Sequence, residues 1–149
     1  MRCVAAALLM TNASLAMAAS DAQFHYAMEC QGCHAADGTG SVSSVPSLKD
    51  HVATFLTVPG GREFLAQVPG AAQAPMNDAA LADVLNWILH EFGPAADAEH
   101  AAPYTAEEVG RLRRTPLTNV AATRAALVKQ IATASPGTAR ATSARSTRP

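Results

Sequence analysis

The clearest pattern of hydrophobic and polar positions lies between Asp78 and Phe92. Apolar residues recur there with the spacing of one helical face, and polar residues occupy the other face. The apolar positions are Leu81, Val84, Leu85, Ile88, Leu89 and Phe92, with Trp87 beside them. Asn77 is a favourable N-cap, and Gly93-Pro94 ends the pattern. The pattern predicts an amphipathic helix over 78–92, with His90 on its solvated face.

Shorter helical segments precede this one. A helix is predicted over Asp21–Glu29, with Phe24, Tyr26 and Met28 available for the core. A helical turn is predicted over Arg62–Val68, between Pro-Gly segments. No segment alternates in the manner of a strand. We therefore expect an all-α fold of about three helices in the first two thirds of the chain.

The last third predicts a helical extension. Thr105 and Glu108 have the spacing of a capping box, which begins a helix that runs to about Arg114. A second helix is expected from about Asn119 to Ala132. Its inward positions are predicted to be Val120, Arg124, Leu127, Val128 and Ile131. Residues from Thr133 onward are rich in Ala, Ser, Thr and Arg, a composition typical of disorder.

The first residues have the features of a secretory signal peptide. Arg2 supplies a positive start, residues 4–10 form an apolar run, and Ala16-Met17-Ala18 is typical of a cleavage site. Removal of this segment would also remove Cys3. We expect a signal peptide over 1–19, a main domain over 20–95, a basic helical extension over 96–132 and a tail over 133–149, with the mature protein in the periplasm and without an integral membrane segment.

Composition and charge narrow the picture further. The chain has 149 residues, of which 49% are apolar but only 5% aromatic, so a domain of this size has a thin core of its own. Residues 21–108 hold twelve acidic and two basic side chains, whereas residues 109–149 hold eight basic and no acidic ones. This asymmetry predicts electrostatic docking of the extension, either on its own domain or on a partner. Nucleic acid is excluded as a partner, since no aromatic residues interleave the basic tail.

The strongest chemical signal is the pentad Cys30-Gln31-Gly32-Cys33-His34. A C-x-x-C-H sequence is the attachment motif of a c-type haem, in which each thiol adds to one vinyl group and the His becomes an axial iron ligand. A thioredoxin-like redox pair would require a βαβ pattern, and a zinc site would require a second Cys/His pair at short spacing. Neither feature is present in the sequence.

Further motifs accompany the pentad. Tyr26 lies four residues before Cys30, the turn Asp37-Gly38-Thr39-Gly40 follows, and Pro46-Ser47-Leu48 comes next. Together with the 78–92 helix and its Trp, these motifs resemble the class I cytochromes c over about residues 21–92. The chain departs from the family at Ala35, where a Gly is common.

This resemblance implies one covalently attached haem c, a C-terminal helix that crosses the first helix, and electron exchange with redox protein partners. It also implies that the carbonyl of Pro46 accepts a hydrogen bond from the ring of His34, which orients the ring and strengthens it as a ligand.

The second axial ligand has more than one candidate. The family usually supplies a Met from a loop before the last helix, and Met76 is the candidate in this chain. However, Met76 directly precedes the N-cap, so it is equally suited to a hydrophobic staple on Leu81. His51 is a further candidate, and an open sixth position is another interpretation.

Arg62 follows Pro59-Gly60-Gly61, a segment that allows a tight turn or a close backbone approach. Its guanidinium is suited to a haem propionate, because it binds carboxylates at two points. The alternative is a solvated Arg at the start of a surface helix.

The sequence thus predicts a periplasmic one-electron carrier rather than an enzyme, which passes electrons from a dehydrogenase or quinol oxidoreductase to an oxidase or another cytochrome. Two alternatives stay open. One is a haem-based gas-binding or sensing module with an open distal site. The other is a cytochrome subunit of a larger dehydrogenase.

Overall fold

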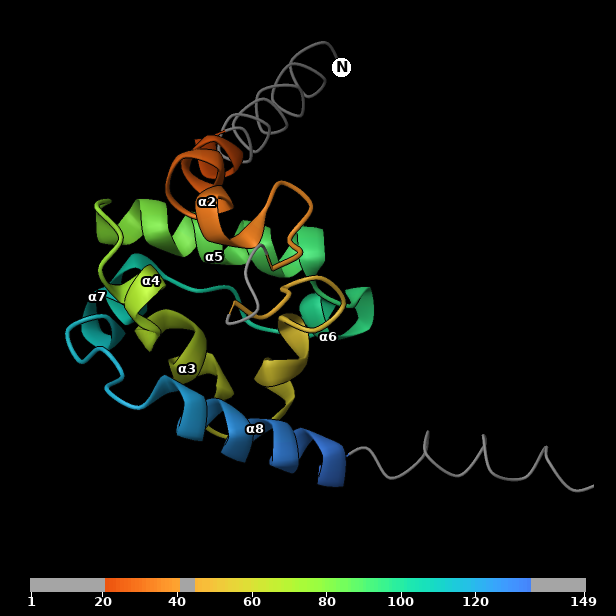
Figure 1. Cartoon of the computed structure of the whole chain (residues 1–149). Helices are drawn as coiled ribbons and strands as arrows, with labels where there is room; N and C mark the ends of the chain where they lie inside the picture. Colours follow the sequence, from red (N-terminus) through yellow and green to blue (C-terminus); the bar gives the residue numbers. More distant parts are fainter. Residues whose placement is uncertain (1–20, 41–44, 135–149) are drawn as a thin grey trace, which may run out of the picture.

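The computed structural model describes residues 21–40 and 45–134, and within these ranges it contains helices and loops but no strand (Figure 1). Residues 21–29 form the first helix. It is followed by α2 (Gln31–His34), the 3₁₀-helix η1 (Ala53–Thr57), α3 (Gly61–Gln67), α4 (Pro69–Ala72), α5 (Asp78–Phe92), α6 (Ala95–Glu99), α7 (Ala106–Leu112) and α8 (Val120–Ala134). The predicted all-α fold is confirmed. The expected signal peptide lies outside the described residues, as does the expected tail over 133–149 except for Thr133 and Ala134, which belong to α8 rather than to a disordered segment.

Helix α5 is the centre of the fold and has the bounds that its hydrophobic pattern predicts. The side chain of Asn77 caps it, since Oδ1 accepts a hydrogen bond of 2.8 Å from the backbone N–H of Ala80. All six positions of the apolar face are buried, and His90 on the other face is exposed as expected. Gly93 ends the helix in extended backbone, so α5 has a defined start, face and end.

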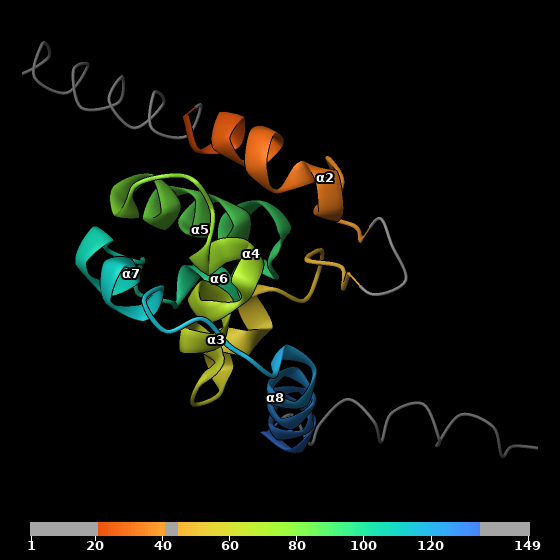
Figure 2. The same cartoon turned by 60° about the vertical axis from the view of Figure 1, so that its left-hand side comes forward.

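The first helix lies across α5 (Figure 2). Its buried side chains are Ala22 and Tyr26, which are four residues apart and so share one face. The ring of Tyr26 contacts Trp87 and Phe92 of α5, with centroid distances of 5.1 and 5.3 Å. These contacts fix the crossing of the two helices.

The prediction that Phe24 and Met28 enter the core is wrong. Their side chains are 62% and 63% exposed. Two residues along a helix rotate a side chain by about 200°, so both point away from the face that carries Tyr26. Aromatic and sulfur-containing side chains suggested burial, but among the described residues of this helix only the face of Ala22 and Tyr26 is buried.

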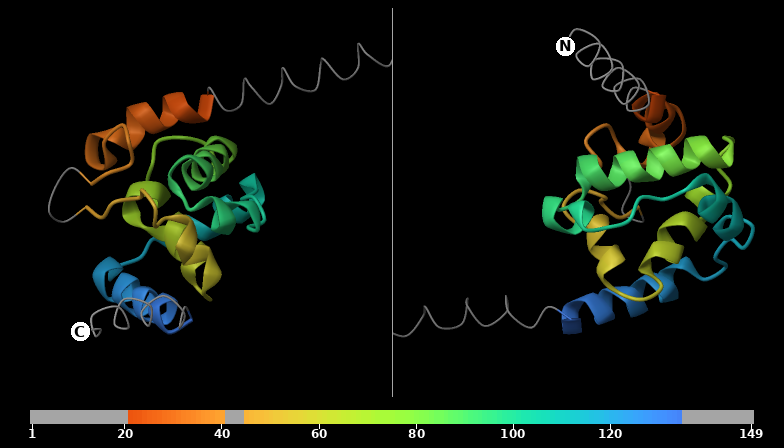
Figure 3. Two further views of the ribbon diagram at one scale, coloured as in Figure 1. Left: turned by 90° about the vertical axis from the view of Figure 1, so that its right-hand side faces the viewer. Right: turned by 180° about the vertical axis from the view of Figure 1, so that it is seen from behind.

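The C-terminal extension packs on the rest of the chain rather than forming a separate unit (Figure 3). Helix α7 packs mainly against α5, and α6 packs against η1. The N-cap prediction for α7 is confirmed, because the N–H of Glu108 donates to Oγ1 of Thr105 at 3.2 Å. Val109 is fully buried, and the neighbouring Gly110 allows the close approach of Asp78.

Helix α8 lies at the end of the molecule opposite the first helix (Figures 1 and 3). It docks through apolar side chains, since buried Leu127 packs with Phe55, Val58 and Phe64. The expected pairing of its basic residues with an acidic surface is not found, because no ion pair of α8 occurs among the described residues. Burial of apolar surface therefore decides its position.

No helix within residues 21–40 and 45–134 is both long and apolar enough to span a membrane.

Candidate haem site

A partly open cavity of about 360 Å³ lies between the helices. It is lined by residues of α2, the loop around Pro46, α3, α4, α5 and α8, and most of its lining is apolar. The floor consists of Leu81, Val84, Leu85, Ile88 and Leu89 of α5. Its size lies in the range of cofactor and ligand pockets. The composition predicts a thin core, and the cavity takes up the space that a larger core would fill.

The structure brings Cys30, Cys33 and His34 together at this cavity. The N–H groups of Cys33 and His34 both donate to the carbonyl of Cys30, at 3.1 and 3.0 Å, and so form one helical turn. Residues three apart share a face of such a turn, which directs both thiols to one side. No disulfide joins the two cysteines.

The end of the pentad is fixed by the first helix. Ala35 has a φ of 57°, in the left-handed region, and this turns the chain away after His34. The hydroxyl of Tyr26 donates to the carbonyl of Ala35 at 2.6 Å. The aromatic residue before the pentad thus has a direct role in holding its end.

A glycine turn connects the pentad to Pro46. Gly38 has a φ of 77°, and a Cβ atom there would lie 2.7 Å from the ring of Phe92. The carbonyl of Gly38 accepts a hydrogen bond of 2.8 Å from the N–H of Leu48. Asp37 closes the turn, since Oδ1 accepts from the hydroxyl of Thr39 at 2.6 Å, which lowers the pKa of this carboxyl. This arrangement brings Pro46 to the wall of the cavity next to His34.

His34 has the environment of a metal-binding imidazole. Its Nδ1 is buried without a hydrogen-bond partner of ordinary geometry. Burial lowers the pKa of His34, while the backbone of Pro46 acts in the opposite direction. A neutral imidazole is the form that binds metals. The cavity, the paired thiols and the buried imidazole therefore fit a covalently held haem.

The two other interpretations of the pentad are not supported. The pKa of Cys30 is raised to about 11 by burial first, and then by the nearby Glu29 and Cys33. Reactive and zinc-binding cysteines require a thiolate, which such an environment disfavours. No group of three or more metal-binding side chains of the kind that zinc needs occurs within the described residues.

Arg62 is not brought to the cavity. Its Nε and Nη2 donate to the two oxygens of Glu108 at 2.6 and 2.7 Å, and its guanidinium carbon lies 4.0 Å from the ring centroid of Tyr104. It also donates to the carbonyls of Ala102 and Pro103. Arg62, which was expected to bind a propionate, instead joins α3 to the extension, because residues 102–108 pack over the start of α3.

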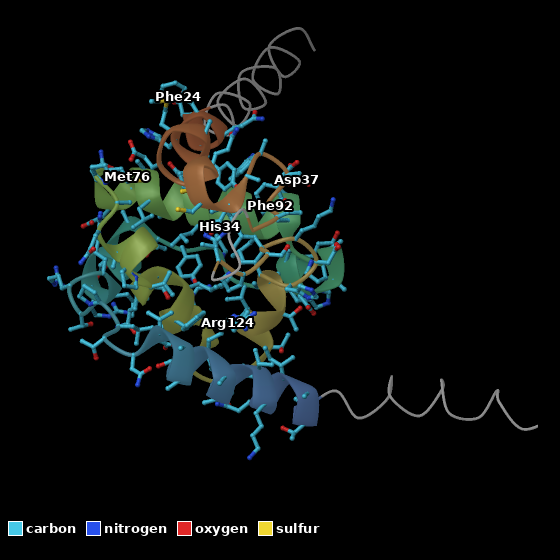
Figure 4. The ribbon with its side chains drawn as sticks, viewed as in Figure 1. Phe24, His34, Asp37, Met76, Phe92 and Arg124 are labelled. Carbon is cyan, nitrogen blue, oxygen red and sulfur yellow. The ribbon has the colours of Figure 1, made fainter. Side chains whose placement is uncertain are left out.

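Met76 is also not among the residues that line the cavity. It lies before the start of α5, apart from His34 (Figure 4), and its half-buried side chain packs on the core cluster that includes Leu81. Its carbonyl accepts a hydrogen bond of 2.8 Å from Arg113. Of the two expectations for Met76, the geometry agrees with the hydrophobic staple. His51, the other named candidate, is exposed and does not line the cavity.

Arg124, which the sequence predicts as an inward position of the last helix without assigning it a role, lines the cavity. It is half-buried and projects from α8 toward the interior, beneath His34 (Figure 4). Within the described part of the chain it makes no hydrogen bond and no ion pair. A signal was present, because Arg124 shares a helical face with the apolar residues Val120 and Leu127. Val120 also lines the cavity, so this face of α8 is turned toward it.

The fold and the cavity define a small helical haem protein of the c type. Comparison with known proteins identifies its family. The chain is 36% identical over 122 residues to a Cytochrome c-552 from Thermus thermophilus, a match that covers 70% of this chain and 82% of the relative. A second Cytochrome c-552 from Thermus thermophilus is 35% identical over 108 residues, which cover 60% of this chain and 82% of that protein.

The chain therefore belongs to the class I cytochrome c family, and the resemblance read from its motifs is confirmed. It is a monohaem c-type cytochrome with one covalently attached haem c, and it is an electron carrier that exchanges electrons with redox protein partners. No protein-family model and no solved structure matches the chain.

Proposed function

We propose that the protein is a periplasmic one-electron carrier, not an enzyme, that receives electrons from a dehydrogenase or quinol oxidoreductase and passes them to a terminal acceptor. The observation that carries this proposal is the convergence of Cys30, Cys33 and His34 on one apolar cavity. Such a mostly apolar cavity holds a redox group in a fixed setting with little water. The expected export signal supports the periplasm, where c-type haems are attached.

Each residue of the pentad has a distinct role in this proposal. Cys30 and Cys33 would hold the haem covalently, and the imidazole of His34 would bind its iron. The carbonyl of Pro46 orients the His34 ring through Nδ1, which is otherwise left buried without a partner. When bound, the haem iron supplies a reversible one-electron change. The apolar lining excludes water and so limits reorganisation during that change.

Arg124 supplies the counter-charge for the haem. A haem carries two anionic propionates, and an unpaired guanidinium at the wall of an apolar cavity is suited to one of them. We place the propionate contact at Arg124 rather than Arg62, because the guanidinium of Arg62 is already bonded to Glu108.

The partner surface lies around the attachment edge. Cys33 is exposed, so the haem edge that it holds lies near the surface. Phe24 and Met28 are exposed on the helix that leads into the pentad. Exposed apolar side chains next to a redox group are suited to the small, short-lived interfaces of electron-transfer partners.

The test of this proposal is covalent haem attachment and reversible redox behaviour. The protein, produced with a c-type haem attachment system, is expected to give a haem-stained band after denaturation, to occur in the periplasmic fraction and to titrate as a one-electron couple. Cys30→Ala combined with Cys33→Ala should remove the stained band, whereas His90→Ala, an exposed control, should retain it. A stained band in the double variant would contradict the assignment.

A further inference from the structure

We propose that no side chain of this protein fills the second axial position of its haem iron, and that this position binds a small uncharged diatomic ligand such as CO or NO. The inference rests on the proposed haem attachment at Cys30, Cys33 and His34, and it goes beyond electron transfer. It assigns a ligand site to the part of the cavity that the pentad does not form.

The chemical composition of the cavity wall carries this inference. Among the described residues that line it, His34 is the one imidazole and the pentad cysteines are the one source of sulfur. Residues 41–44 and 135–149, which the structure does not describe, contain no Met, His, Cys or Lys in the sequence. The mature chain therefore offers no common iron ligand at this wall besides the pentad.

The remaining polar residues of the wall are unsuitable as ligands. Glu29 and Ser47 directly adjoin Cys30 and Pro46, which belong to the side of the cavity that carries His34. The hydroxyl of Tyr104 donates to the carbonyl of Arg62 at 2.7 Å, and burial raises the pKa of Tyr104, so a phenolate is disfavoured.

Arg113 holds the backbone of the segment that carries Met76. The guanidinium donates to three backbone carbonyls of this segment, those of Ala72, Ala74 and Met76, at 3.0, 2.6 and 2.8 Å. It also pairs with Asp78 at 3.2 Å. The side chain of Met76 packs on the core cluster and does not line the cavity. A shift of this backbone toward the cavity would break the contacts of Arg113 together.

The walls that do not belong to the pentad determine the class of ligand. Helices α3 and α4 contribute Phe64, Leu65 and Ala71, and Val68 lies between the two helices. An apolar wall disfavours charged or strongly hydrated molecules, because their hydration would be lost without replacement. A small neutral molecule incurs little of this cost, and the guanidinium of Arg124 is already assigned to a propionate.

The decisive measurement is the optical spectrum of the ferrous, haem-loaded protein before and after addition of CO. We expect a five-coordinate, high-spin spectrum that changes to a saturated CO complex at micromolar CO. Met76→Leu retains side-chain volume, so the variant should fold and should bind CO within twofold of the parent. A six-coordinate, low-spin ferrous spectrum that resists CO would overturn the inference. If the oxidised parent showed a far-red sulfur-to-iron band that Met76→Leu removed, the ligand would be Met76 and the inference would be overturned.

A pair of variants tests the location of the site. Ala71→Phe places a ring in the cavity from α4 and should lower CO affinity at least tenfold, whereas Ala79→Phe on the exposed face of α5 should not change it. Equal CO affinity in both variants would contradict a site at this wall. Covalent haem content is measured on the same samples. A protein without covalent haem would overturn the proposed function, whereas covalent haem with a closed sixth position would overturn this inference alone.

Discussion

Arg62 and Glu108 form a two-point ion pair, in which Nε and Nη2 of the arginine donate to the two carboxylate oxygens at 2.6 and 2.7 Å. The two residues are 46 positions apart, so the pair joins α3 to the C-terminal extension. Tyr104 lies against the same guanidinium. The extension is therefore held to the haem domain by a specific, half-buried contact, and its loss has measurable consequences.

Glu108→Gln should make stability less dependent on pH. The hydrogen bond from Arg62 lowers the pKa of Glu108 in the folded protein. The stabilisation that the Arg62–Glu108 pair provides is thus fully present above the pKa of Glu108 in the unfolded chain, about 4.3. It is lost as the pH falls through the lower pKa of the folded protein. At pH 7 we expect a loss of about 1–2 kcal/mol, since the pair is partly exposed. Urea denaturation at pH 7 and below pH 4 measures the difference, which should shrink in acid. Glu107→Gln, an exposed neighbour, is the control. An unchanged difference across this range would contradict the assigned role.

Arg113→Ala should destabilise the protein by about 2–4 kcal/mol, because it removes several hydrogen bonds of a charged group and leaves carbonyls before α5 without their donor. Arg113→Lys should recover part of this loss, since an ammonium reaches fewer of the carbonyls. Thermal unfolding of the haem-loaded protein gives the values, with Arg114→Ala on the surface as control. Equal stability of the Arg113 and Arg114 variants would show that the contacts are dispensable.

Gly38→Ala should destabilise the protein by about 2–4 kcal/mol. The residue has a positive φ, which disfavours Ala, and the new Cβ would overlap the ring of Phe92. Gly32→Ala meets no atom within 4 Å and lacks a positive φ, so it should change stability little. Chemical denaturation of both haem-loaded variants tests the comparison. Similar midpoints for the two would mean that the glycine turn tolerates a side chain.

Arg124→Gln should lower the reduction potential by some tens of millivolts, because a cation near the iron favours the reduced, less positive state. The optical spectrum should stay unchanged, since Arg124 is not an iron ligand. Lys129→Gln removes a charge from the exposed face of the same helix and should shift the potential by much less. Spectroelectrochemical titration of the three proteins provides the test. Equal potentials would place the propionate contact elsewhere.

Local patterns predicted the parts of the fold that depend on neighbours in the chain. The helix from Asp78 to Phe92 was predicted with its bounds, because its cap, its stripe and its stop signal are all local. The haem-attachment motif was predicted from the pentad alone. Two thiols and an imidazole within one helical turn face the same cavity without help from distant residues. The fold class and the cofactor follow from these two segments.

The same reasoning failed where a side chain depends on what packs against it. Phe24 and Met28 have the side chains of core residues, but they lie opposite the face that Tyr26 buries. Arg62 appears in the sequence as a residue that could bind a cofactor, but its guanidinium is bonded to residues 102–108 of the extension. Arg124 belongs to a segment whose charge suggested surface docking, yet its helix is placed by the burial of Leu127.

The sequence by itself determined that this protein is a helical c-type cytochrome with one haem, because covalent attachment and helix periodicity are properties of short segments. The tertiary structure decided which residues surround that haem. It directed Arg124 toward the cavity, engaged Arg62 in an ion pair and held Met76 beside α5. The physical reason is that each of these side chains can contact several groups that lie far apart in the sequence. Which contact forms depends on which segments pack together.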